Sequence, residues 1–253
     1  MQRFLVTPQT LAADTVVLQG STSRQIAVVL RMRTVDKVIL SDGQGGEALC
    51  QLEDVTARRV VLRVLERSTS TAEAVVRLHL YPALLRAPRF EMVLQKATEL
   101  GVVAITPVLC RRSVARPSDA GVPERWRSIV REAFEQSGRG FLPVVAEPIS
   151  LLAGCSAASQ ADLALCCSEH GGADLTTLVA RHTPRTVAAM IGPEGGLDAE
   201  EVALASHHGL HAVTLGPRIL RAETAAIALC AAVFCLSGDW SMGARGRGRG
   251  RET

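Results

Sequence analysis

The chain has 253 residues, of which 47% are apolar, and its formal net charge at pH 7 is only +3. This length suits one large domain or two modest ones with a sizeable core, and the small positive excess argues only weakly for nucleic acid. No run approaches the roughly 20 apolar residues of a membrane span. Residues 1–6 turn polar too soon for a secretory signal, so we expect a soluble, cytoplasmic protein with no membrane partner.

The seven cysteines do not indicate a disulfide framework or a zinc site, because their number is odd and no Cys-x-x-Cys occurs. We expect them to behave as small buried hydrophobes. His207 and His211 are four residues apart, but Gly209 between them disfavours a continuous helix, and no carboxylate or cysteine completes a ligand set. The sequence therefore predicts no metal site.

Residues 1–70 have the pattern of a small, mostly β domain. Asp42-Gly43-Gln44-Gly45-Gly46 is a strong hairpin signal, and a short amphipathic helix is expected over residues 23–32. Short strands with tight turns predict a small barrel, with strands over residues 37–40, 47–52 and 59–65. Seven arginines make the unit basic, which fits a solvated face and phosphate contact about equally well: Arg24, Arg31, Arg33, Arg58, Arg59, Arg63 and Arg67.

The polar stretch 67–73 marks a domain boundary, and residues 71–240 then alternate strands with helices. Strands are expected over residues 75–81, 102–109, 162–167, 186–191 and 211–215. Helices are expected over residues 90–100, 124–136, 175–181 and 222–236, and from residue 198. In the first of these helices Met92, Val93 and Ala97 should face inward. Strands separated by helices predict an α/β fold, with a parallel sheet covered on both faces.

Two of the helices carry further signals. Asp198 is a good N-cap, and Glu200 and Glu201 in the first turn complement the helix dipole. The last helix, over residues 222–236, is almost purely apolar, so it should be buried on all sides. Burial against its own sheet is one explanation, and we favour a homodimer interface.

Two loops rich in glycine and proline each close an apolar run: Met190-Ile191-Gly192-Pro193-Glu194-Gly195-Gly196-Leu197 and Leu215-Gly216-Pro217-Arg218-Ile219-Leu220-Arg221-Ala222-Glu223-Thr224. In a parallel sheet such loops lie side by side at the carboxyl ends of strands, where ligands bind. Neither loop is a P-loop, no G-x-G-x-x-G is present, and Glu194 would repel a phosphate. A cationic ligand without phosphate fits better, and S-adenosylmethionine is such a ligand. Plain turns are the alternative.

These paired loops resemble those of the bacterial 16S ribosomal RNA (uracil-N3) methyltransferases of the SPOUT superfamily. Other segments agree in order, and the resemblance extends over residues 1–237: Val29-Leu30-Arg31, Gln95-Lys96-Ala97-Thr98-Glu99-Leu100-Gly101-Val102, Arg111-Arg112-Ser113 and Glu135-Gln136-Ser137-Gly138-Arg139. It implies a PUA-like β-barrel RNA-binding domain at 1–70. It also implies a SPOUT methyltransferase domain at 71–240 with a parallel sheet and a C-terminal trefoil knot. The family works as homodimers, with knotted loops that bind S-adenosylmethionine. The expected partner is 16S rRNA in the assembled small ribosomal subunit.

Site residues follow from the loops together with the resemblance. The expected cofactor-binding residues are Cys166, Ile191, Gly192, Glu194, Gly195, Gly196, Leu215, Gly216, Ile219, Leu220, Thr224 and Ala225. Glu169, near the end of the 162–167 strand, is a further candidate for the pocket wall. The expected RNA-binding residues are Arg24, Arg31, Arg86, Arg111, Arg112 and Arg139.

Methylation of uracil N3 requires an in-line approach to the sulfonium methyl, loss of the N3 proton, and a target base that is unpaired or flipped out. We expect Arg221 and Arg218 to stabilise negative charge on the uracil carbonyl oxygens. Glu223 or Glu194 is expected to accept the proton, directly or through water. Two alternatives stay open: Glu223 as a simple first-turn helix charge, and Arg221 as a buried salt-bridge partner.

Residues 241–253 form a Gly/Arg tail that is predicted to be disordered when free. The tail either adds a salt-sensitive RNA contact or is inert. Two other functions compete with base methylation: an RNA-binding protein that keeps the fold without catalysis, and a 2′-O-ribose methyltransferase of the same superfamily. A hydrolytic triad of Asp162, Ser168 and His170 is discounted, because no G-x-S-x-G is present.

Overall fold

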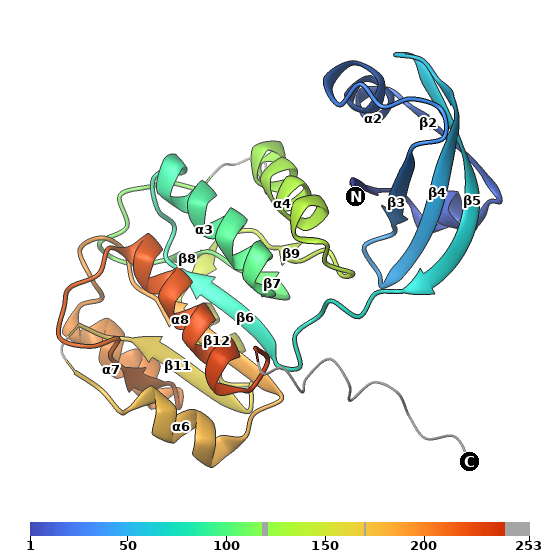
Figure 1. The fold of residues 1–253 in the computed structure, drawn as a ribbon. Helices are drawn as coiled ribbons and strands as arrows, with labels where there is room; N and C mark the ends of the chain where they lie inside the picture. Colours follow the sequence, from blue (N-terminus) through green and yellow to red (C-terminus); the bar gives the residue numbers. More distant parts are fainter. Residues whose placement is uncertain (118–120, 170, 241–253) are drawn as a thin grey trace, which may run out of the picture. The chain divides into compact units, whose positions relative to one another are not determined.

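The computed structural model describes residues 1–117, 121–169 and 171–240, which form two compact units (Figure 1). The first unit contains Met1–Glu73 and Arg131–Leu142. The second contains Ala74–Val130 and the described residues from Pro143 onward. The predicted disordered tail, 241–253, lies outside the described residues.

The first unit is built on one curled five-stranded sheet of order β1-β3-β4-β5-β2 (Figure 1). Only β1 and β3 pair in parallel, and the other ladders are antiparallel. The strands are β1 Arg3–Leu5, β2 Thr15–Gln19, β3 Lys37–Ser41, β4 Gly46–Val55 and β5 Arg59–Thr69. The helical elements are α1 Pro8–Ala12, α2 Ser21–Arg24 and the π-helical turn η1 Gln25–Val29.

Local signals explain the first unit well. The predicted hairpin between β3 and β4 is confirmed, and Asp42 Oδ1 accepts hydrogen bonds from Gln44 N at 2.7 Å and Gly46 N at 2.9 Å. The helix expected over residues 23–32 is shorter and mixed. It passes from α2 into η1 and stops at Leu30, because Arg31 adopts a positive φ of 53° that no helix can continue.

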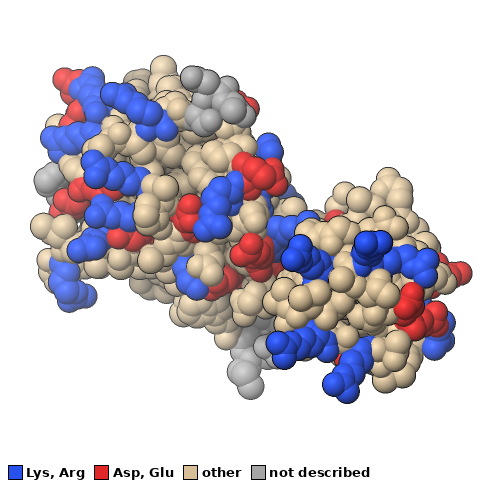
Figure 2. Space-filling view, turned by 90° about the horizontal axis from the view of Figure 1, so that it is seen from above, with Lys and Arg blue, Asp and Glu red and all other residues tan. Residues whose placement is uncertain are grey.

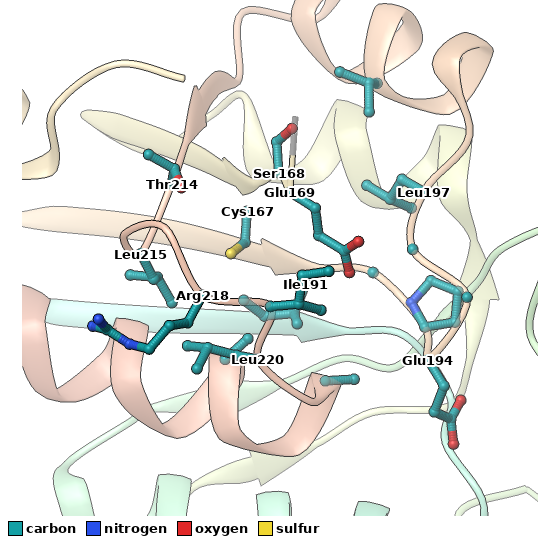
Figure 3. A pocket seen from close by; sticks show the side chains of 18 of the residues that line it. Cys167, Ser168, Glu169, Ile191, Glu194, Leu197, Thr214, Leu215, Arg218 and Leu220 are labelled. Carbon is teal, nitrogen blue, oxygen red and sulfur yellow. The ribbon is translucent and has the colours of Figure 1, made fainter. Parts of the chain in front are cut away.

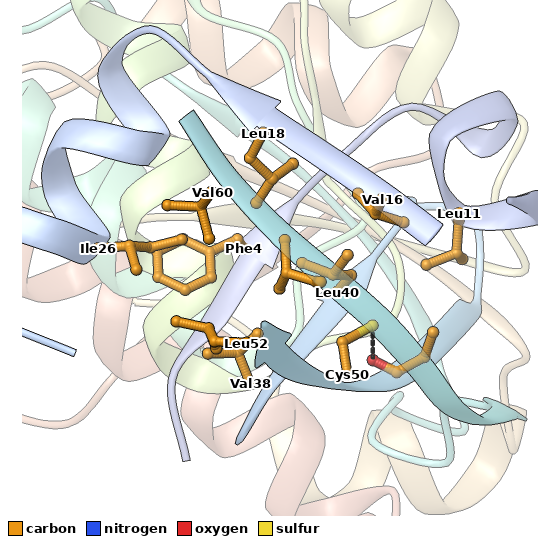
Figure 4. Packing of buried hydrophobic residues seen from close by; sticks show 12 residues of the cluster. Phe4, Leu11, Val16, Leu18, Ile26, Val38, Leu40, Cys50, Leu52 and Val60 are labelled. Atoms are coloured by element: carbon orange, nitrogen blue, oxygen red, sulfur yellow. Dashed lines mark hydrogen bonds between the residues drawn. The ribbon is translucent and has the colours of Figure 1, made fainter. Parts of the chain in front are cut away.

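The core of the first unit follows the strand period of two. Alternate residues of β3, β4 and β5 point to one face and pack with side chains from β1, β2 and η1 (Figure 4). Cys50 lies in this core, where burial raises the pKa of its thiol to about 11. All seven cysteines are free and five are buried, as small hydrophobes should be, whereas Cys167 is half-buried and Cys235 is exposed.

The helix α4, Glu124–Ser137, is shared between the two units. Its second half packs in the first unit, where Glu135 Oε1 accepts from Leu5 N at 2.8 Å and Arg131 donates to Leu5 O at 3.2 Å. The sequence pattern placed residues 131–142 in the second domain. It could not reveal this return of the chain, because the bonded partner lies more than a hundred residues upstream.

Arg139 is buried, and this overturns its predicted role in RNA binding. Its side chain is only 3% exposed and forms a two-pronged ion pair with Glu73, at 2.7 Å and 3.3 Å. Glu73 also accepts from the backbone N–H groups of Gly140 and Phe141. A guanidinium enclosed in this way does not reach an RNA phosphate.

The second unit is a six-stranded, fully parallel sheet of order β13-β11-β12-β6-β7-β9. Helices α3 and α8 cover one face of the sheet (Figure 1). Helices α5 and α7 pack together, with α5 against β6 and β12 and α7 against β13. The strands are β6 Arg77–Pro82, β7 Ala104–Ile105, β9 Val144–Val145, β11 Leu163–Cys167, β12 Thr186–Ile191 and β13 His211–Val213. The helices are α3 Ala87–Leu100, α5 Leu151–Ala158, α6 Leu175–His182, α7 Ala199–His207 and α8 Ala222–Leu236. No helix in the described part of the chain is both long and apolar enough to cross a membrane.

The second unit differs from prediction in one strand and in one face of α3, and it contains α5, β9 and β10, Ile149–Ser150, which were not predicted. The strand expected over residues 102–109 is split at Pro107, which has no N–H to donate, into β7 and β8, Val108–Leu109. β8 pairs instead with β10. In α3, Met92 is 47% exposed rather than inward-facing, whereas Val93 and Ala97 are buried as predicted.

Helix α8 is buried on one face only. Residues such as Leu229, Val233 and Phe234 pack inward against α3 and the sheet. The opposite face carries half-buried small apolar side chains: Ile227, Ala228, Ala231 and Ala232. The helix therefore covers its own sheet but is not buried on all sides in the single chain, and the homodimer interface stays a prediction.

Replacing Glu73 with Ala should strongly destabilise the first unit, because it removes the carboxylate that pairs with the buried Arg139 guanidinium. We expect a loss of about 2–4 kcal/mol in the free energy of unfolding, below the full cost of a deeply buried pair because Glu73 is partly exposed. Urea unfolding followed by circular dichroism measures this loss. Glu53→Ala is the matched control, since it breaks the exposed pair with Arg63 and should cost about 0–1 kcal/mol.

His79 of β6 should make stability depend on pH. Its Nε2 contacts Thr106 Oγ1 at 2.9 Å, its Nδ1 contacts the Tyr81 hydroxyl at 3.1 Å, and burial lowers its pKa from 6.5 to about 4. The unfolded chain therefore takes up the proton first, so stability falls as pH drops from 6.5 towards 4. His79→Gln should flatten this part of the profile. Urea midpoints from neutral pH down to about pH 4.5 test this, and equal slopes for both proteins would contradict it.

Candidate functional site

The carboxyl ends of three neighbouring strands form a pocket in the second unit. β11 lies between β12 and β13, and all three are parallel. The segments that follow them, 167–169, 191–197 and 214–220, enclose about 240 Å³ (Figure 3). Open α/β sheets bind ligands at this edge.

The first loop turns sharply between β12 and α7. Gly196 N donates to Pro193 O at 2.9 Å, and Gly196 has a φ of 68°, which favours glycine. The predicted N-cap Asp198 then starts α7 in a capping box with Glu201, with bonds of 2.9 Å and 3.0 Å. This turn keeps backbone rather than side chains at the pocket wall.

The second loop runs from β13 to α8. Gly216 has a φ of 99°, and its carbonyl accepts from Thr214 Oγ1 at 3.2 Å. Ile219 is 83% exposed, whereas Leu215 and Leu220 are half-buried against the pocket. Arg221 ends the loop as the N-cap of α8.

Ten of the twelve residues expected to bind the cofactor line this one pocket: Ile191, Gly192, Glu194, Gly195, Gly196, Leu215, Gly216, Ile219, Leu220 and Ala225. Cys166 and Thr224 do not. Cys166 is 1% exposed inside the sheet, because successive strand residues point to opposite faces, and its neighbour Cys167 lines the pocket instead. Ala222 and Ala225 line the pocket from α8, while Thr224 between them is exposed.

Several wall residues were missed by sequence reasoning: Arg112, Cys167, Ser168, Val202 and Thr214. The ends of β11 and β13 carry three of these residues: Cys167, Ser168 and Thr214. The predicted parallel sheet could therefore have identified them as pocket residues. No short sequence pattern indicated that Arg112 or Val202 lies beside the two glycine loops.

The acidic side chain that projects into the pocket is Glu169. Figure 3 shows its carboxylate between Cys167 and Leu197, over Ile191. A Cβ built on Gly196 would lie 3.7 Å from Glu169 Oε1. Glu194 contributes to the wall, but its carboxylate turns away from the pocket (Figure 3).

Glu194 and Glu223 share one arginine behind the pocket. Arg89 Nη1 donates to Glu194 Oε1 at 2.9 Å, and Arg89 Nε lies 3.8 Å from Glu223 Oε1. Glu223 is only 7% exposed. The second carboxylate oxygen of each glutamate is buried and has no hydrogen-bond partner among the described residues.

The two arginines expected to take part in catalysis are exposed. Arg218 lines the pocket mouth and Arg221 stands at the start of α8. Neither makes an ion pair with any residue in the described ranges. A buried salt bridge for Arg221, the alternative considered above, is therefore excluded.

The expected RNA-binding arginines fall into different environments. Arg24 and Arg31 are exposed in the first unit, and Arg86 is the exposed N-cap of α3. Arg111 pairs with Glu200 at 2.5 Å and Asp198 at 3.2 Å, which raises the pKa of its guanidinium. Figure 2 shows basic side chains interspersed with acidic ones on the face in view of the second unit.

Arg111 and Arg112 also hold the first loop and the start of α7. Arg111 N donates to Glu201 Oε1 at 2.7 Å, and Arg112 Nη1 donates to the Gly195 carbonyl at 2.7 Å. Both arginines therefore form hydrogen bonds within the second unit. Their exposure alone does not identify them as contacts to phosphate.

Fold and site together define a class. The second unit has a pocket at three adjacent strand ends, two of them followed by glycine loops, with an acidic side chain on the pocket wall and no phosphate-binding motif. Such a parallel α/β unit suits a small organic ligand without phosphate. The model of the RNA methyltransferase domain matches residues 72–234, and that of the RNA methyltransferase PUA domain matches residues 23–65. The chain belongs to this family of RNA methyltransferases, as the resemblance predicted.

Individual relatives agree with this assignment. The chain is 34% identical over 226 residues to ribosomal RNA small subunit methyltransferase E of Synechocystis sp., covering 88% of this chain and 74% of the relative. It is 31% identical to the protein of the same name from Bacillus subtilis, covering 92% and 96%. A crystal structure of ribosomal RNA small subunit methyltransferase E from Neisseria gonorrhoeae, bound to S-adenosyl methionine, matches with a TM-score of 0.86 and 33% identity, covering 93% and 98%.

Proposed function

We propose that this protein transfers the methyl group of S-adenosylmethionine to N3 of a uridine in 16S ribosomal RNA. The observation that carries the proposal is the pocket at the ends of β11, β12 and β13, in a chain 33% identical to a relative whose structure holds that donor. The small-subunit methyltransferase relatives, which match nearly the whole chain, support ribosomal RNA as the substrate.

The residues present fit the methyl donor. Ile191, Leu197, Leu215 and Leu220 offer apolar walls for an adenine ring, and the glycine turns offer backbone hydrogen bonds. Glu169 offers a carboxylate to a cationic ligand. When bound, S-adenosylmethionine supplies an electrophilic methyl group.

Arg221 and Arg218 are proposed to act on the uracil. Both are exposed beside the pocket and neither is neutralised by an acidic neighbour in the described ranges, so both are free to stabilise negative charge on the carbonyl oxygens. Positioning of the flipped base against the donor supplies much of the remaining rate.

The N3 proton is proposed to leave to Glu223, directly or through water, with Glu194 as the second candidate. One oxygen of Glu223 has no hydrogen-bond donor among the described residues, which supports it as an acceptor. Glu194 is committed to Arg89 by a hydrogen bond of 2.9 Å and turns away from the pocket, which argues against it. Because Glu223 is buried, it must become reachable when the substrate binds.

We further propose a homodimer and a C-terminal trefoil knot, as the family resemblance implies. The apolar outer face of α8 supports the dimer, since a second copy would cover its half-buried alanines. The proposed contacts to RNA phosphates are the exposed arginines Arg24, Arg31 and Arg86. The proposed substrate is RNA in the assembled small subunit, in the cytoplasm.

Two measurements separate this function from its competitors. Calorimetry with S-adenosylmethionine should show one site per protomer, whereas an RNA-binding protein without catalysis would show none. Mass spectrometry of nuclease-digested product RNA distinguishes a methylated base from a methylated ribose. A ribose product would replace the proposed reaction with 2′-O-methylation.

Arg221→Ala should lower turnover by about 10²–10³-fold, because it removes a donor to the developing oxyanion. Arg221 caps α8 without a side-chain hydrogen bond, so stability should change by no more than about 0.5 kcal/mol. Methyl transfer to small-subunit particles and calorimetry with the donor measure the two effects separately. Arg181→Ala, at an exposed arginine of α6, is the control. Wild-type turnover in Arg221→Ala would remove this residue from the mechanism.

Gly196→Ala should weaken binding of the donor, because alanine strains a φ of 68° in the first loop. Gly209→Ala is a matched control, at a φ of 83° in the turn between α7 and β13. Both variants should lose about 1 kcal/mol of stability, and only Gly196→Ala should raise the dissociation constant of the donor. Equal affinities for the donor in the two variants would show that the first loop does not contribute to donor binding.

A further inference from the structure

Arg89 of α3 joins two segments that are far apart in the sequence. Its Nη1 donates to Glu194, which is 105 positions away in the first loop, and its Nε faces Glu223 at the start of α8. A guanidinium presents five N–H donors in a rigid fork and is suited to hold two carboxylates at fixed positions. Both carboxylates belong to segments that form the pocket wall.

Two parallel helices place their N-termini at this cluster. Arg89 near the start of α3 meets Glu223 near the start of α8, and at the other ends a Cβ on Gly101 would lie 3.5 Å from the Phe234 ring. Neither helix has a side-chain cap at its N-terminus. Both helix dipoles therefore favour the carboxylates and disfavour an arginine in the first turn. Arg89 breaks the local rule, and such exceptions concentrate at functional sites.

The cluster holds two carboxylates against one guanidinium. One oxygen of Glu194 and one of Glu223 are buried and lack a donor in the described part of the chain. Without Arg89, both carboxylates would lose their only ion-pair partner in the described residues, and we expect their mutual repulsion to move them apart. Glu194 would carry the first loop with it, and Glu223 would carry the start of α8, so the pocket would lose its shape.

We propose that Arg89 is a positioning residue for methyl transfer: it fixes the first loop and the start of α8 against α3, and so sets the width of the donor pocket. The inference rests on the proposed function. Arg89 does not touch the pocket itself, so it acts through Glu194 and Glu223. Arg112 holds the same loop from its exposed side through the neutral Gly195 carbonyl, which is a weaker restraint.

The test compares Arg89→Met with Arg125→Met, which breaks a similar ion pair to Glu91 of the same helix α3. Calorimetry gives the dissociation constants of S-adenosylmethionine and of its demethylated product, S-adenosylhomocysteine. Arg89→Met should weaken both by roughly 10-fold or more and by equal factors, because the walls move while no charge that contacts the sulfonium is lost. Arg125→Met should bind both like the wild type.

Rescue separates positioning from general destabilisation. Arg89→Met combined with Glu194→Gln removes one of the two opposed charges, so donor affinity should return to within roughly 3-fold of the wild type. Arg89→Lys keeps the charge but loses the fork, and should be intermediate. If Arg89→Met does not fold, Arg89→Lys alone must still weaken donor binding.

Three results would overturn the role of Arg89: wild-type affinity in Arg89→Met, an equal loss in Arg125→Met, or no recovery in the double variant. A wild-type protein that binds no donor would instead refute the proposed function. The two failures are therefore distinguishable in one set of titrations.

Discussion

The in-register parallel pairing of β11 with both of its neighbours is the constraint on which the site depends. Cys167 at the end of β11 pairs with Ile191 at the end of β12 and with Val213 at the end of β13. Three loops therefore leave the sheet at the same level, and a small ligand can touch all of them. A slip of one residue in either ladder would turn the wall residues of that strand to the opposite face.

Ion pairing distinguishes two groups among the arginines near the site and the domain boundary. One group is committed within its unit: Arg139 to Glu73, Arg111 to the start of α7, and Arg89 to two glutamates. The other group is exposed at helix starts or at the pocket mouth: Arg86, Arg218 and Arg221. The second group, together with the exposed Arg24 and Arg31 of the first unit, provides the side chains that we propose for RNA.

Local signals in the sequence predicted much of the second unit. The bounds of β12 and α8, and Asp198 as an N-cap, rest on patterns within a few residues, and the structure matches them. Features that depend on residues far apart in the sequence were not predicted. The burial of Arg139 depends on a partner 66 positions away, and the choice of Cys167 over Cys166 depends on which face of the sheet the pocket occupies. The glycine and proline pattern identified the paired loops, and the family resemblance added their ligand, whereas no pattern pointed to Arg89 as their link.

The arrangement of charge explains how a protein with a net charge of only +3 can serve both a cationic donor and a polyanion. Within the second unit, Glu169 lies inside the pocket, while Glu194 and Glu223 stand behind it, restrained by one guanidinium. Arg218 lies at the mouth of the pocket, and Arg86 and Arg221 lie at helix N-termini, all without an ion pair to any described residue. A cation entering the pocket meets acid, and a phosphate chain approaching from solvent meets arginine. Because the Glu169 carboxylate and these arginines occupy different positions around one pocket, the two ligands can meet there without competing for the same groups.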